Sequence, residues 1–119
     1  MKGDSALTGH FLLTDEGFRP VARLSELREG HARKVEVDDL EVALWRVGGR
    51  VYAIGNVCAH QHFSLLHQGI LEGLTVGCPM HGWRYSLETG LALEGSGRVP
   101  VYRVMMKGDT VLVSLAAEG

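Results

Sequence analysis

The sequence predicts a single all-β domain. Turn-forming residues recur at short intervals along the 119 residues, and apolar residues alternate with polar ones in short runs between several of them, as in antiparallel strands. The length suits one domain that buries a core without help from disulfides. One brief helical turn is predicted at 25–29, capped by Ser25 and ended by Gly30.

Hairpins account for the predicted strands. Their strands and turns, in chain order, are 35–37 and 40–47 around Asp38-Asp39, 44–47 and 51–54 around Gly48-Gly49-Arg50, 70–71 and 74–76 around Glu72-Gly73, and 101–106 and 110–115 around Lys107-Gly108-Asp109. Glycine and aspartate suit the tight turns of such hairpins. Residues 1–17 show no clear period, so we expect a tail or an edge extension there and the domain proper at 18–119.

Charge and hydropathy exclude several partners. The net charge of −2 argues against nucleic acid, which needs a concentrated basic face. The segment from Val51 to Leu71 carries no formal charge but contains histidines, glutamines and glycines, so it is not a membrane span. The first 13 residues lack the apolar run of a signal peptide. We therefore expect a soluble, cytoplasmic protein.

The two cysteines each stand near a histidine. Cys58 precedes His60, and Cys78 precedes His81. Two thiolates and two imidazoles are the ligands of a Rieske [2Fe–2S] cluster, with the cysteines on one iron and the histidines on the other. Zinc accepts the same set, although zinc fingers usually pair cysteine with cysteine and histidine with histidine. A Cys58–Cys78 disulfide in a secreted domain is the remaining alternative.

The segments 56–60 and 78–90 resemble the two cluster loops of the Rieske ferredoxin family, and the resemblance runs from about Phe18 to Leu115. It implies an antiparallel β-sandwich or barrel with a small cluster-binding subdomain inserted at about 55–86. It also implies one Rieske-type [2Fe–2S] cluster on the four Cys and His residues. The first loop departs from the family pattern after His60: His62 stands where glycine is usual, which predicts a one-residue insertion.

The resemblance suggests residues that tune or shield the cluster. Tyr85 occupies the position of a tyrosine that donates its hydroxyl to a cysteine sulfur, here that of Cys58; alternatively it is a packed aromatic with its hydroxyl in water. Trp83 replaces a serine that donates to the cluster in high-potential members. Loss of that donor predicts a midpoint potential in the lower half of the Rieske span of about −150 to +300 mV.

Five further residues in or near the two loops have more than one interpretation. Leu65 or Leu66 corresponds to a leucine that shields the cluster in relatives. Pro100 belongs either to a proline-containing loop over the cluster or simply to the start of a strand. His62 and His67 are either surface histidines of the first loop or an extra ligand, docking residue or proton relay. His10 and His31 are not expected to be ligands.

These features predict an electron carrier with no catalytic residue. The leading hypothesis is a standalone ferredoxin that relays single electrons from a reductase to a terminal oxidoreductase, such as a ring-hydroxylating dioxygenase. A second hypothesis is the small Rieske subunit of a cytoplasmic NADH-dependent nitrite reductase. A third, of another class, is a zinc-stabilised binding module without a redox role.

Overall fold

The computed structural model describes residues 17–56, 66–79, 83–93 and 97–117. The elements in order are β1 (Phe18–Arg23), η1 (Leu24–Glu26), β2 (Ala32–Val37), β3 (Leu40–Val47), β4 (Arg50–Gly55), η2 (Leu66–Gln68), β5 (Ile70–Glu72), β6 (Thr75–Gly77), β7 (Arg84–Ser86), β8 (Val101–Lys107) and β9 (Thr110–Ala117). None of the helices in these residues has the length and hydropathy of a membrane span.

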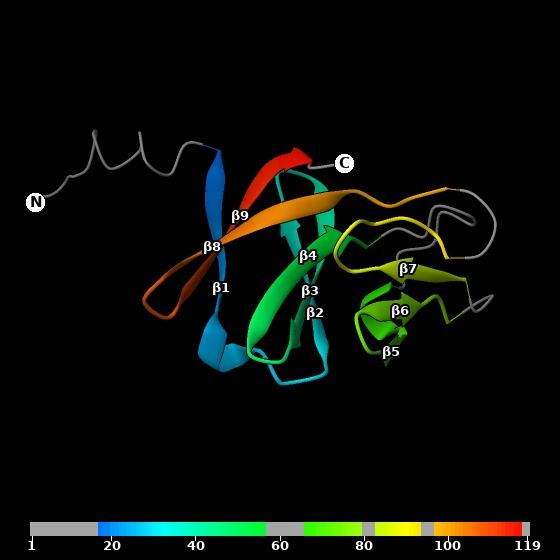
Figure 1. The fold of residues 1–119 in the computed structure, drawn as a ribbon. Coiled ribbons are helices and arrows are strands. Elements are labelled where there is room, and N and C mark those ends of the chain that lie inside the picture. Colours follow the sequence, from blue (N-terminus) through cyan, green and yellow to red (C-terminus); the bar gives the residue numbers. More distant parts are fainter. Residues whose placement is uncertain (1–16, 57–65, 80–82, 94–96, 118–119) are drawn as a thin grey trace, which may run out of the picture.

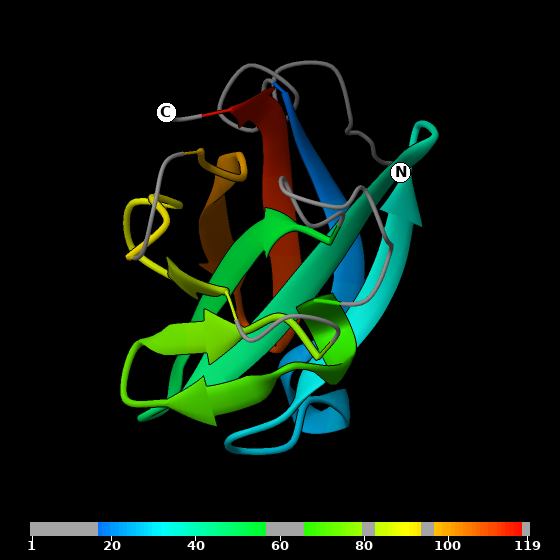
Figure 2. The ribbon, with the colours of Figure 1, turned by 90° about the vertical axis from the view of Figure 1, so that its right-hand side faces the viewer.

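The strands form two antiparallel sheets. The larger sheet has the order β1-β9-β8-β4-β3-β2 (Figure 1). Its two edge strands, β1 and β2, contact each other, which makes a nearly closed barrel. The smaller has the order β5-β6-β7 and lies beside the β3–β4 part of the barrel (Figure 2). Since the small sheet comes between β4 and β8 in sequence, the prediction of an all-β barrel with a small insertion is confirmed.

The tight turns lie where the sequence predicts them, but Arg50 and Lys107, predicted as turn residues, are strand residues that pair with Val47 and Thr110. Asp38 and Asp39 have φ of 49° and 69°, and Gly48 and Gly49 have φ of 62° and 80°, the positive values that two-residue type I′ turns require. The β5–β6 turn lies one residue later than predicted, because Glu72 still pairs with Thr75. Strands β1 and β7 were not predicted: the register of β1 shifts near its proline, and β7 is only three residues long.

The prediction of a helical turn capped by Ser25 is wrong in detail. The turn is a 3₁₀ helix of three residues, and the N–H that precedes it, on Arg23, donates to the Glu26 carboxylate at 3.0 Å. The Ser25 hydroxyl donates instead to Asp109 in the β8–β9 turn at 2.8 Å. Ser25 lies inside the turn, and Asp109 supplies the acceptors for the Leu24 and Ser25 N–H groups that a cap would have satisfied.

Strand β3 is buried on both faces, and this places the small sheet. Val42 and Leu44 point into the barrel core with residues of β4, β8 and β9. Ala43 and Trp45 belong to a second core cluster between the barrel and the small sheet. Because successive side chains of a strand point to opposite faces, each face of β3 contributes to a separate core. The small sheet is thus packed on a rigid strand pair rather than tethered by loops alone.

Candidate metal centre

The second predicted ligand loop begins at a fixed point of the small sheet. Gly77 and Arg84 are the last paired residues of β6 and β7. The Cys78 N–H donates to the Trp83 carbonyl at 2.7 Å, which extends the ladder by one bond. Cys78 itself is 1% exposed. It therefore stands at the base of a β-hairpin loop, and its predicted partner His81 lies outside the described residues.

Asn56 directly precedes the first predicted ligand loop and forms hydrogen bonds to the two residues that follow it. Its carbonyl accepts a hydrogen bond from the Leu66 N–H at 3.1 Å, and its side-chain Oδ1 accepts one from the His67 N–H at 2.6 Å. Asn56 is fully buried and follows directly on β4. The predicted site residues Cys58, His60 and Leu65, with His62, lie between Asn56 and Leu66 and outside the described residues.

The bases of the two loops form one packed unit. Gly69, just after η2, approaches β6 so closely that a Cβ on it would lie 2.4 Å from the Gly77 carbonyl oxygen and 2.6 Å from Val76 Cγ2. Leu66 and Cys78 belong to the same core cluster. The structure therefore brings the start of the second loop next to the end of the first.

Sequence reasoning missed two residues at these bases. Asn56 was only one letter of a motif, although a polar residue beside a buried strand is a signal for a structural hydrogen bond. Gly69 lies outside both ligand-loop segments, 56–60 and 78–90. Without a side chain, Gly69 leaves room for β6 to approach it, and this contact is made by residues distant in sequence.

The structure places four of the predicted tuning and shielding residues. Tyr85 is fully buried, which excludes a hydroxyl in water and requires a partner for it; donation to a sulfur stays a prediction. Trp83 is half-buried against the same core cluster, and Leu66 is fully buried within it. Pro100 directly precedes β8, and its carbonyl accepts the Gly55 N–H at 2.9 Å. It thus occupies the start of a strand, and a covering role stays a prediction.

The described histidines differ in environment. His67 is half-buried in η2, with Nδ1 3.2 Å from Asn56 Oδ1 and Nε2 3.4 Å from the Gln68 amide nitrogen. Burial lowers the pKa of His67, Lys34 lowers that pKa further, and Glu41 opposes both. A neutral ring with its proton on Nδ1 satisfies the Asn56 oxygen. His31 is exposed, and His10 lies outside the described residues.

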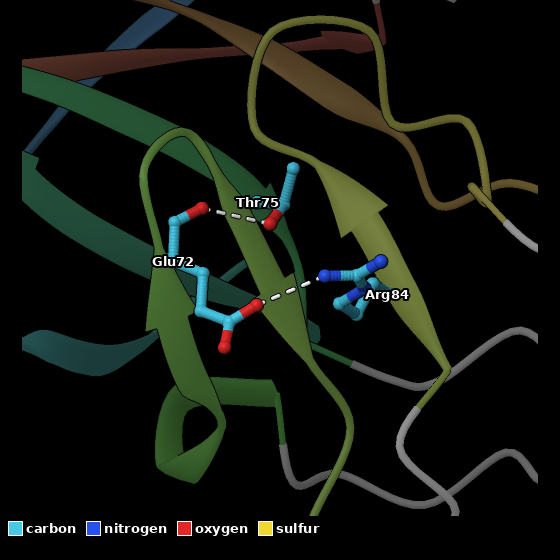
Figure 3. A network of polar contacts seen from close by, with 3 residues as sticks. All are labelled: Glu72, Thr75 and Arg84. Carbon is cyan, nitrogen blue, oxygen red and sulfur yellow. Dashed lines mark hydrogen bonds and ion pairs between the residues drawn. The ribbon is translucent and has the colours of Figure 1, made fainter.

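The outer face of the small sheet carries an ion pair. Glu72 is the one acidic or basic residue in the sequence from Val51 to Trp83, and it binds Arg84 at 2.9 Å across β6 (Figure 3). The Arg84 stem runs close to Gly77, where no side chain stands in its way. Thr75 donates its hydroxyl to the Glu72 carbonyl at 2.8 Å. The pair cancels the single charge of this stretch.

The surroundings of Cys78 suit a metal-bound thiolate. Cys58, its partner in the alternative disulfide, lies outside the described residues. The neighbours of Cys78 in the core cluster are apolar, and burial of an isolated thiolate among them would be costly without a cation. Iron or zinc would supply that cation, so the donor and its environment fit the predicted centre.

Comparisons with known proteins agree on the family. The model of the Rieske [2Fe-2S] domain matches residues 17–103. The naphthalene 1,2-dioxygenase system ferredoxin component of Pseudomonas aeruginosa is 34% identical over 106 residues, which cover 87% of this chain and 100% of that protein.

Two solved structures share the fold over most of the chain. One is the complex of reduced oxygenase and oxidized ferredoxin in carbazole 1,9a-dioxygenase: its matching chain is 28% identical, with a TM-score of 0.78 and coverage of 87% of this chain and 98% of that chain. The other, a putative NADH-dependent nitrite reductase small subunit from Mycobacterium tuberculosis, is 26% identical, with a TM-score of 0.78 and coverage of 85% and 96%. The chain belongs to the Rieske [2Fe-2S] domain family, and its cofactor is a Rieske-type [2Fe–2S] cluster.

Proposed function

We propose that this protein is a Rieske-type ferredoxin that carries single electrons from a reductase to the terminal oxygenase of a ring-hydroxylating dioxygenase system. The match to a ferredoxin component over that protein's whole length supports this role. The similarity to a chain from a solved oxygenase–ferredoxin complex supports an oxygenase as the acceptor. The proposal assigns no catalytic residue, because substrate chemistry belongs to the acceptor.

Cys58 and Cys78 are proposed as ligands of one iron, and His60 and His81 as ligands of the other. When bound, such a cluster accepts and returns one electron. The observation that carries the assignment is the position of Cys78, buried at the base of the β6–β7 loop and next to the end of the first loop. From there each loop needs only a few residues to bring its Cys and His to one cluster.

The ligand set also sets the range of the potential. Two neutral histidines in place of two thiolates leave an oxidised cluster with no net charge, so adding an electron is easier than in an all-cysteine cluster. Rieske centres accordingly lie at about −150 to +300 mV, against about −400 mV for plant-type ferredoxins. The buried Tyr85 hydroxyl is the proposed donor to the Cys58 sulfur.

Metal and sulfide analysis of the purified protein tests the cofactor and its ligands. We expect iron and acid-labile sulfide in the ratio of a [2Fe–2S] cluster and a rhombic electron paramagnetic resonance (EPR) signal after reduction. Cys58→Ser and Cys78→Ser should lose both, whereas the matched control His31→Ala should keep them, because His31 is exposed. A colourless protein with one zinc would refute the redox proposal in favour of a zinc-stabilised module.

A second candidate function is the small subunit of an NADH-dependent nitrite reductase, favoured by the equally similar solved structure of such a subunit. Reoxidation of the reduced protein separates the two candidates. The dioxygenase proposal predicts fast electron transfer to an oxygenase encoded near its gene and none to a nitrite reductase catalytic subunit. The opposite result would replace the proposal. The cytoplasm is the proposed location, because a reducing compartment suits cysteines that bind metal.

A further inference from the structure

Asn56 is fully buried, and its hydrogen bonds join two elements: β3, and η2, which follows the first ligand loop. It is 0% exposed. Its N–H donates to the Glu41 carbonyl at 3.0 Å, and its side-chain Nδ2 donates to the Glu41 carboxylate at 3.3 Å. One residue thus ties the end of β4 to its neighbour β3.

The two oxygens of Asn56 accept hydrogen bonds from Leu66 and His67, which directly follow the loop. The carbonyl holds the Leu66 N–H, and Oδ1 holds the His67 N–H and faces His67 Nδ1. These bonds close the segment 57–65 at both ends. Buried polar groups left without such partners are costly, so the arrangement resists opening.

We propose that Asn56 is a positioning residue for the cluster: its carboxamide fixes both ends of the loop that carries Cys58 and His60 relative to β3, and so places that ligand pair opposite Cys78. The inference rests on the proposed ligands. It differs from a general packing role because the carboxamide has a direction: Oδ1 must face His67 and Nδ2 must face Glu41.

This direction can be tested by exchanging the amide of Asn56 with the carboxylate of Glu41. In Asn56→Asp, an oxygen replaces Nδ2 and meets the Glu41 carboxylate at the 3.3 Å separation of the present bond, and two like charges repel there. Adding Glu41→Gln restores a donor, because the glutamine amide can donate to one oxygen of the introduced carboxylate. The other oxygen of that carboxylate still accepts the His67 N–H. The double variant also keeps the net charge of the parent. Asn56→Leu removes both functions at similar volume.

The test measures iron release to a chelator and the EPR spectrum of the reduced protein. We expect Asn56→Leu and Asn56→Asp each to speed iron release by about tenfold, as loss of a buried hydrogen bond implies, and to shift the rhombic signal. The double variant Asn56→Asp/Glu41→Gln should return to within about twofold of the parent, a rescue expected of two residues that interact. Ser114→Ala, which alters another buried polar residue in β9, should change neither readout.

Parent-like release and spectrum in both single variants would overturn the inference, as would a double variant no better than Asn56→Asp alone. If Asn56→Leu does not fold, the comparison of Asn56→Asp with Asn56→Asp/Glu41→Gln still tests the inference. A parent protein without any Rieske signal would instead refute the proposed function, so the two failures are distinguishable.

Discussion

Replacing Gly69 by alanine tests whether the bases of the two ligand loops depend on close backbone contact. Gly69 does not need a positive φ, so the substitution adds a Cβ without backbone strain of its own. That Cβ would lie 2.4 Å from the Gly77 carbonyl oxygen, whereas an ordinary contact begins at 3.4 Å. The two segments must therefore separate by about 1 Å.

The cost can be worked from these contacts. Overpacking a tight site costs about 1–3 kcal/mol, and the upper end applies here because the obstructing atom is a backbone oxygen that cannot rotate away. A loss of about 3 kcal/mol corresponds to a fall in Tm of roughly 12 °C for a domain of this size. Separation of the two segments should also weaken the pairing of Ile70 with Gly77, which is next to the proposed ligand Cys78.

Gly77→Ala is the matched control. Its Cβ would lie 3.5 Å from Arg84 Cγ and 3.8 Å from the Ile70 carbonyl oxygen, both ordinary contacts. We expect its free energy of unfolding to stay within about 1 kcal/mol of the parent, since an added Cβ mainly restricts the unfolded chain. Denaturant unfolding of both variants, with iron content measured in parallel, makes the comparison. Equal stability of the two variants would refute the reasoning.

Three further predictions concern the cluster and its surroundings. Tyr85→Phe should lower the midpoint potential by about 40 mV, the equivalent of a hydrogen bond of about 1 kcal/mol; protein-film voltammetry checks this, and an unchanged midpoint would show that the hydroxyl does not donate to sulfur. In the parent the midpoint should lie below about +150 mV and fall at alkaline pH, because the reduced cluster favours protonated His60 and His81; a flat profile up to about pH 11 would mean that these histidines are not exposed ligands. Burial lowers the pKa of His67, so the unfolded chain binds that proton more tightly. The stability contributed by neutral His67 is then fully present above the unfolded pKa of about 6.5 and is lost as pH falls from there through the lower folded pKa. The Tm of His67→Gln should consequently decline less than that of the parent between about pH 7 and about pH 5.5, and parallel declines would contradict the assignment.

The features that sequence predicts well are those with local causes. The turns at Asp38-Asp39 and Gly48-Gly49 follow from the few residue types that tolerate positive φ, and the strands beside them follow from alternation. The ligand motif, likewise, is a matter of residue type and spacing. The family resemblance then supplied the barrel and its insertion.

The features that sequence misses depend on partners far along the chain. Ser25 is a reasonable helix cap until Asp109 of the β8–β9 turn approaches it. The Asn56 side chain is satisfied in the core only because Glu41 of β3 and His67 of η2 form hydrogen bonds with it. The short strand β7 is stable because β6 pairs with it and because its central residue, Tyr85, is buried in the core cluster. None of these contacts leaves a periodic signal.

The meeting of Gly55 with Pro100 has a consequence for the modular construction of the protein. The chain leaves the barrel at one of these residues and returns at the other, and they are joined by a hydrogen bond of 2.9 Å. A short linker there could turn β4 and β8 into an ordinary hairpin, so the cluster-binding insertion is separable in topology. Removing the insertion would nevertheless destabilise the barrel, because it would expose Trp45 and Ile54, which the insertion buries. A barrel engineered without the insertion would therefore need polar replacements on that face, because a large exposed apolar patch promotes aggregation.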